Sequence, residues 1–146
     1  MKNLETTNTG SPYFNVYLAA QIFLGDHALL SSAARVENLL TTVGDVHHIF
    51  PKEYLNNHGY NSRRTQVANF ALLDTTLNIS IGKKAPCEYF STALENYEHE
   101  EVFWKNLSEN CIPREILNMT YEHYDEFLEQ RRQLMAQKIQ QYYARL

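Results

Sequence analysis

The chain has 146 residues, which is enough for one domain with one sizeable hydrophobic core. Its net charge of −4 gives no general case for nucleic-acid binding, and its many tyrosines and few glycines exclude a disordered or glycine-rich repeat protein. Cys87 and Cys111 are too far apart for a zinc ribbon and too few for a disulfide framework, which favours a reducing, cytoplasmic location.

The first 43 residues predict a polar tail followed by helices. Residues 1–10 are polar and lack the apolar core of a signal peptide. Ser11 and Pro12 are typical of a helix start and Gly25 of a helix end, so we expect a helix between them. That helix is apolar on nearly every face but too short to span a membrane, so we expect it to be buried, either here or against a further domain. A second short helix is expected over residues 35–42.

The segment 44–95 contains strand, loop, strand and helix in that order. Residues 46–50 and 67–73 have the composition of strands. A short helix should begin at Pro51, a polar loop should cover residues 60–66, and a turn should begin at Asp74. Pro86 is typical of a further helix start. This order of elements is that of a ββα-metal finger.

The remainder, residues 96–146, is expected to be helical. Val102, Phe103 and Leu107 form one apolar stripe, and Pro113 marks a break. A long amphipathic helix is expected over residues 121–145. Its apolar stripe consists of Phe127, Leu128, Leu134, Met135, Ile139, Tyr142 and Tyr143. The predicted fold class is therefore α+β and mainly helical, as a single domain over residues 1–146 with a small ββα-metal finger embedded between α-helices.

The residues suited to chemistry begin with the adjacent pair His47 and His48, followed by Asn69 and Asn78 nine positions apart. Hydrolysis of a phosphodiester needs a base that works near neutral pH, and histidine is such a base. It also needs a divalent metal, whose ligands can be imidazole, carboxylate or side-chain carbonyl. A histidine pair alone is weak evidence, but Pro51 three residues after His48 and the two asparagines strengthen it.

The segments DVHHIFPK and VANFALLDTTLNISIGKKAPCEYF resemble the HNH nuclease domain of GmrSD-like type IV restriction proteins. The flanking segments SPYFNVYLAAQIFLGD and FLEQRRQLMAQKIQQYY resemble that family as well, so the likeness covers residues 11–145. It implies a metal-dependent DNA endonuclease that restricts foreign or modified DNA. It also implies a ParB/sulfiredoxin-like NTPase as a separate domain or subunit.

The resemblance also assigns roles to four residues. His48, the first residue of His-x-x-Pro, matches the general base, and Asn69 matches the asparagine that holds the loop so that the base is correctly aimed. His47 and Asn78 match the metal ligands. Many HNH enzymes have aspartate where this chain has His47, although colicin-type DNases also have histidine there. We expect magnesium or manganese. Nickel and zinc are alternatives, because a neutral ligand offsets less of the cation's charge and magnesium is then bound more weakly.

Two questions stay open at this stage. The basic residues around the motif can hold DNA phosphates or belong to solvated loops, and both interpretations have equal support; they are Lys52, Arg63, Arg64, Lys83 and Lys84. The alternative to a nuclease is a catalytically silent HNH-like module that binds a partner protein or DNA, because no phosphate-binding G-x-x-x-x-G-K-[ST] motif occurs in the chain.

Overall fold

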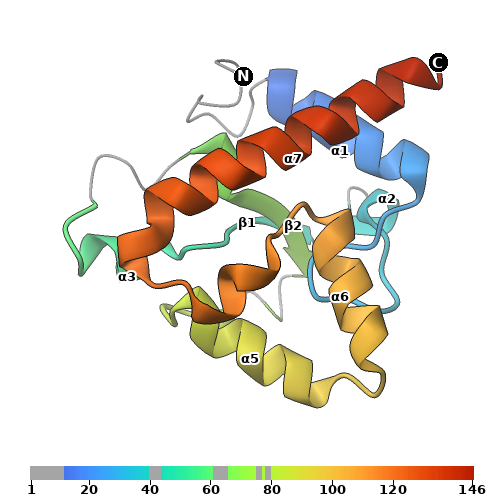
Figure 1. The fold of residues 1–146 in the computed structure, drawn as a ribbon. Helices are drawn as coiled ribbons and strands as arrows, with labels where there is room; N and C mark the ends of the chain where they lie inside the picture. The colour runs from blue at the N-terminus through green and yellow to red at the C-terminus, as the bar shows by residue number, and fades with distance from the viewer. Residues whose placement is uncertain (1–11, 40–43, 61–65, 75–76, 78–79) are drawn as a thin grey trace.

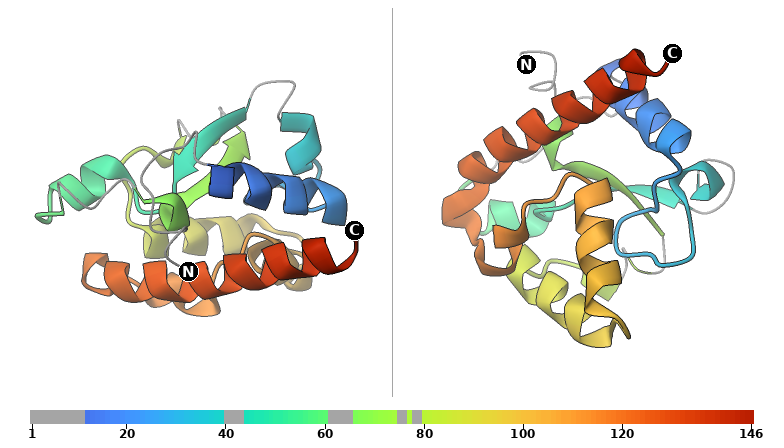
Figure 2. Two further views of the ribbon diagram at one scale, coloured as in Figure 1. Left: turned by 90° about the horizontal axis from the view of Figure 1, so that it is seen from above. Right: turned by 45° about the vertical axis from the view of Figure 1, so that its right-hand side comes forward.

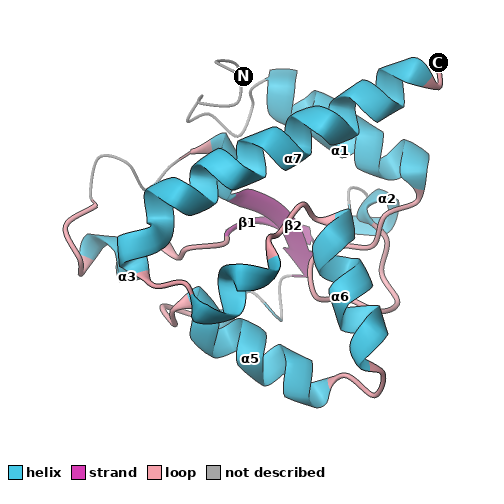
Figure 3. Cartoon of the chain, viewed as in Figure 1, coloured by secondary structure: helices cyan, strands magenta, loops and turns pink. Residues whose placement is uncertain are grey.

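Two short antiparallel strands lie in the middle of the molecule, and helices surround them (Figure 1, Figure 3). The strands are β1 (Gly44–His48) and β2 (Phe70–Asp74), and their register places His48 opposite Phe70. The computed structural model describes residues 12–39, 44–60, 66–74, 77 and 80–146. The predicted α+β, mainly helical class is confirmed.

The helices account for most of the described chain. The α-helices are α1 (Pro12–Leu24), α2 (Val36–Leu39), α3 (Lys52–Asn56), α5 (Pro86–Asn96), α6 (Glu100–Glu109) and α7 (Tyr124–Ala144). Short 3-10 turns are η2 (Val67–Asn69), η3 (Arg114–Asn118) and η4 (Tyr121–His123). Within the described part of the chain, no helix has the length and apolar character that crossing a membrane requires.

Helix α1 ends where the sequence predicts, at Gly25. This glycine has a φ of 72°, a conformation that residues with a Cβ rarely adopt. Its amide donates to Ile22 O at 3.1 Å, and the amide of Asp26 donates to Gln21 O at 2.9 Å. These two bonds satisfy the last carbonyls of the helix, which is the pattern of a Schellman motif.

Helix α1 packs along α7, as both views in Figure 2 show. Phe14 and Tyr17 are buried on the packed side, and Phe14 meets Phe70 of β2 edge to face at 5.6 Å between ring centroids. Tyr13 and Phe23 are exposed, although the ring of Phe23 lies 5.5 Å from that of Tyr142 on α7. Helix α1 is therefore buried in part within this chain, and burial of its exposed residues against a further domain stays a prediction.

Both strands differ from their predicted bounds. Strand β1 begins and ends two residues before the predicted strand. It ends early because the amide of Ile49 still donates to the backbone carbonyl of Asn69, whereas the amide of Phe50 donates to the Asn69 side chain. The predicted strand 67–73 begins instead as the turn η2 and becomes a strand at Phe70. Helix α2 is described only to Leu39. The expected helix cap at Ser11, the end of the helix 35–42 and part of the turn after Asp74 lie outside the described residues.

The C-terminal region follows the predicted pattern with three differences. Val102 is exposed, so the stripe on α6 consists of Phe103 and Leu107 alone. The predicted helix 121–145 begins with the turn η4, whose start is capped by the Thr120 hydroxyl, and continues as α7. Tyr143 near the end of α7 is exposed, whereas the ring of its neighbour Tyr142 lies 5.5 Å from that of Phe23 on α1.

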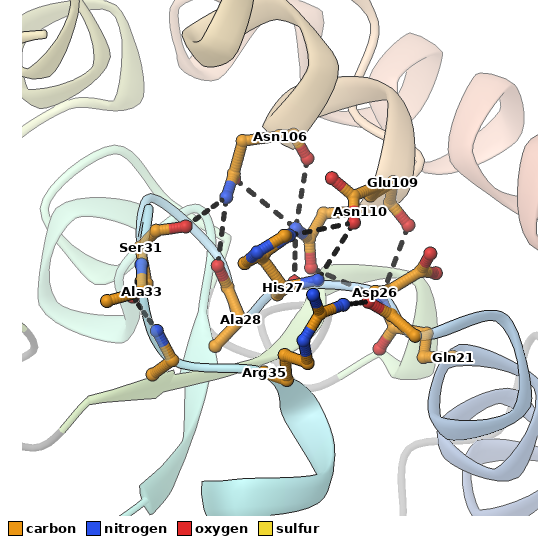
Figure 4. Close-up of polar contacts among 12 residues, drawn as sticks. Gln21, Asp26, His27, Ala28, Ser31, Ala33, Arg35, Asn106, Glu109 and Asn110 are labelled. Carbon is orange, nitrogen blue, oxygen red and sulfur yellow. Dashed lines mark hydrogen bonds and ion pairs between the residues drawn. The ribbon is translucent and has the colours of Figure 1, made fainter.

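A polar network ties the loop between α1 and α2 to helix α6 (Figure 4). The Asn106 side chain accepts a hydrogen bond from the amide of Leu30 at 2.8 Å and donates to the carbonyls of Ala28 and Ser31 at 3.0 and 2.9 Å. The same loop also donates from Leu29 N to Leu72 O of β2 at 3.1 Å. The loop therefore covers the edge of β2 that β1 leaves open.

Candidate functional site

The two adjacent histidines lie on opposite faces of the β-ribbon. Successive side chains of a strand point to opposite sides, and those of His47 and His48 do so. His47 contacts Tyr89 of α5, with ring centroids 5.8 Å apart. His48, the last residue of β1, lies edge-on to Phe70 at 5.0 Å, on the face that packs against Phe14 of α1. His48 is half-buried and His47 is 3% exposed.

His47 is held by the hydroxyl of Tyr89. That hydroxyl lies 3.2 Å from His47 Nε2 and donates a short hydrogen bond to the carbonyl of Ile49. Burial raises the pKa of Tyr89 well above its ordinary value, so the hydroxyl keeps its single proton. Because this proton goes to Ile49 O, the hydroxyl accepts from His47 Nε2–H. A neutral imidazole that donates from Nε2 carries its lone pair on Nδ1.

Asn69 joins the end of β1 to the start of β2. Its side chain is fully buried; Oδ1 accepts from the amide of Phe50 at 2.8 Å, and Nδ2 donates to the carbonyl of the same residue at 3.0 Å. Its backbone carbonyl accepts from Ile49 N at 2.8 Å. Three hydrogen bonds thus fix the two residues that follow His48. This is the geometry that the positioning role of Asn69 requires, and the role itself stays a prediction.

Sequence reasoning missed the part that Tyr89 and Arg131 play at this site. Tyr89 lies in the helix expected to begin at Pro86, and its place in the sequence shows no partner for its hydroxyl. Arg131 lies four positions from both Phe127 and Met135, on the buried side of α7. That spacing was the available signal, because a charged residue inside an apolar stripe must find buried partners.

The remaining predicted site residues divide into two groups. Asn78, Arg63 and Arg64 lie outside the described residues, so whether Asn78 approaches His47 stays a prediction. The three lysines Lys52, Lys83 and Lys84 are exposed. Among the residues that the structure describes, no cluster of three or more histidine, cysteine or acidic side chains could hold a metal. The metal site expected from the sequence has only two protein ligands, one imidazole and one amide, so the absence of a three-residue cluster does not bear on it.

The described part of the site offers a half-buried imidazole at a strand end, a second imidazole held in one tautomer, and a rigid connection between the strands. The first is of a residue type that can act as a base near neutral pH, although its Nε2 atom is buried from solvent, and the second is of a type that can supply one metal ligand. No model of a known protein family, no curated protein and no solved structure matches the chain.

Proposed function

We propose that the chain is a metal-dependent DNA endonuclease module of the ββα-metal type. The single observation that carries the proposal is the pair of hydrogen bonds between the Asn69 side chain and the backbone of Phe50. They hold the loop that leaves β1 directly after His48, and a general base must be aimed to within a fraction of an ångström. DNA as the substrate rests on the resemblance to GmrSD-like nucleases, as does a role in restriction.

In the proposed reaction His48 takes a proton from a water molecule. The oxygen of that water forms a bond to phosphorus, and the bond from phosphorus to the 3′-oxygen breaks. This leaves a 5′-phosphate on one fragment and, after a proton reaches the leaving oxygen, a 3′-hydroxyl on the other. Asn69 contributes by keeping His48 in place rather than by touching the DNA.

The donor atoms present fit a bound divalent metal in part. His47 offers Nδ1 in the tautomer that Tyr89 imposes. Asn78 is the proposed second ligand. A divalent metal bound there would neutralise charge on the phosphate and the leaving oxygen. Magnesium and manganese remain the first expectations, and a ParB-like NTPase remains the proposed partner domain or subunit.

A cleavage assay on supercoiled plasmid tests this function. We expect nicking by the full chain with at least one of Mg²⁺, Mn²⁺, Ni²⁺ or Zn²⁺ and none in excess EDTA. Plasmids with and without modified bases should be compared, since restriction of modified DNA is part of the proposal. Failure to cut any plasmid with any of the four metals, also after addition of an NTPase partner, would contradict it.

A second candidate function is an interaction module that no longer cuts. The observation that favours it is the deep burial of His47, whose Nε2 is already engaged by Tyr89. A catalytic metal site needs an open position for water or substrate. DNA or protein binding without cleavage in the same assay would support this alternative.

A further inference from the structure

Arg131 lies in the middle of α7 and is fully buried beneath the start of β2. Its Nη1 atom donates to the carbonyl of Ala68 at 2.9 Å and to the carbonyl of Phe70 at 2.5 Å. These are the carbonyls of the residues directly before and after Asn69. One nitrogen of the guanidinium therefore binds the backbone on both sides of Asn69, the residue that holds the loop after His48.

The rest of the guanidinium is bound to uncharged groups. Nε and Nη2 both donate to the carbonyl of Asn110 at 3.2 Å, and Nη2 lies 3.4 Å from the hydroxyl of Tyr17. Burial raises the pKa of Tyr17 well above its ordinary value, so this hydroxyl carries no charge. Among the described residues, no carboxylate forms an ion pair with Arg131.

A buried charge without a counter-charge is costly, and an apolar side chain of similar volume in such a place often preserves or raises stability. A contribution to the stability of the fold therefore does not by itself explain why position 131 is an arginine. Its fixed planar fork does something that methionine and lysine cannot do, because it binds three carbonyls from two separate segments at once.

We propose that Arg131 is a positioning residue for His48 that acts through Asn69. This inference rests on the proposed nuclease function and names a further residue of the same site. The hydrogen bonds of Arg131 go to Ala68, Phe70, Asn110 and Tyr17. Its effect passes through the backbone around Asn69 to the Asn69 side chain, and from there to Phe50.

The hydrogen bonds fix three successive peptide groups. Arg131 holds the peptide group before Asn69 through Ala68 O and the one after Phe70 through Phe70 O. The peptide group between these two is held by the bond from Ile49 N to Asn69 O. With all three fixed, the direction of the Asn69 side chain is fixed as well, and its two bonds to Phe50 keep their geometry.

The test compares Arg131→Lys with the wild-type chain. Lysine retains the charge but has a single nitrogen, so it cannot keep the contacts to Ala68 and Phe70 together with those to Asn110, and it loses the fixed direction that the planar fork gives to Nη1. We expect kcat for plasmid cleavage to fall on the order of 10²-fold, as for an ångström-scale misplacement of a catalytic group, with KM for DNA unchanged. We also expect the amides of Ile49 and Phe50 to exchange hydrogen faster than other core amides.

Lys138→Met is the matched control. Lys138 lies on the same helix and forms a mostly buried ion pair with Asp26, so its loss also leaves a buried charge without a partner. It touches no residue next to Asn69. We expect this variant to lower stability without any selective change in exchange at Ile49 and Phe50, and without a selective loss of kcat.

Three results would overturn the assignment. They are an Arg131→Lys variant with wild-type kcat and exchange, a Lys138→Met variant with the same local increase in exchange, and a failure of both Arg131→Lys and Arg131→Met to fold, which would make Arg131 a requirement of the fold itself. A wild-type chain that cuts no DNA refutes the proposed nuclease instead. The exchange comparison at Ile49 and Phe50 then still decides whether Arg131 holds Asn69.

Discussion

At the scale of single residues, Asn69 carries the connection between β1 and β2. Replacing Asn69 with Ala leaves the amide and carbonyl of Phe50 without the side chain that binds them. Each buried group stranded in this way costs about 1–3 kcal/mol, so we expect a clear drop in the free energy of unfolding, measured by urea denaturation. The control is Asn56→Ala, an exposed asparagine on α3. Equal midpoints for Asn69→Ala and wild type would contradict the account.

The Tyr89 hydroxyl binds Nε2 of His47 and the carbonyl of Ile49. Tyr89→Phe removes the hydroxyl between His47 and Ile49 but keeps the ring. Residues that orient a metal ligand typically contribute about 10–100-fold to metal affinity, so we expect a weakening of that size for Mn²⁺ in calorimetry. Tyr97→Phe is the matched control, because the buried Tyr97 hydroxyl has no hydrogen-bond partner among the described residues. Unchanged affinity in Tyr89→Phe would exclude His47 as a ligand held this way.

At the scale of elements, α7 contributes most through its buried side. Met135 is fully buried there, whereas its neighbour Leu134 is only partly covered. We expect Met135→Ala to lower the free energy of unfolding by about 2–5 kcal/mol, and Leu134→Ala by clearly less. Thermal and urea unfolding of both variants give the comparison. The reverse order would mean that α7 presents a different side to the core.

The helices were predicted better than the strands, and the reason is physical. Pro12, Gly25 and Pro86 limit backbone conformation locally, so they mark helix ends in the sequence itself. The ends of β1 and β2 depend on which carbonyl or side chain meets the partner strand. At Phe50 the side chain of Asn69, and not the backbone of a partner strand, binds the amide and the carbonyl. No periodic pattern in the sequence shows that a side chain will replace a backbone partner.

The candidate site was predicted in its residue types but not in its supporting contacts. His48 and Asn69 stand in a recognisable motif. Arg131 and Tyr89 reach the site from α7 and α5, which are distant in sequence, so their contacts follow from tertiary packing alone. The opposite faces of His47 and His48, by contrast, follow from strand geometry alone.

At the scale of the whole molecule, three buried groups make the fold sensitive to alkali. Burial raises the pKa values of Cys111, Tyr17 and Tyr89 above their ordinary values of 9.0 for the thiol and 10.0 for the phenols. Below about pH 9 all three are protonated in both the folded and the unfolded chain. Above it the unfolded chain releases protons first, so the free energy of unfolding falls as pH rises.

We therefore expect the thermal midpoint to decline from about pH 9 upward and to decline further past about pH 10. Circular dichroism melts across this range measure it. Cys111→Ala should weaken the part of the decline that starts near pH 9, since it removes the thiol. A midpoint that stays constant up to about pH 11 would show that these groups are not buried in the folded chain.

The most direct measurement of the central claim is the cleavage rate of His48→Ala relative to wild type, with DNA affinity measured in parallel. If His48 is the general base, turnover should fall by about 10²–10⁴-fold, while DNA affinity stays the same because phosphate contacts supply the binding. His99→Ala, which removes an exposed histidine far along the chain, should cut at the wild-type rate. A His48→Ala variant that cuts as fast as wild type would contradict the account.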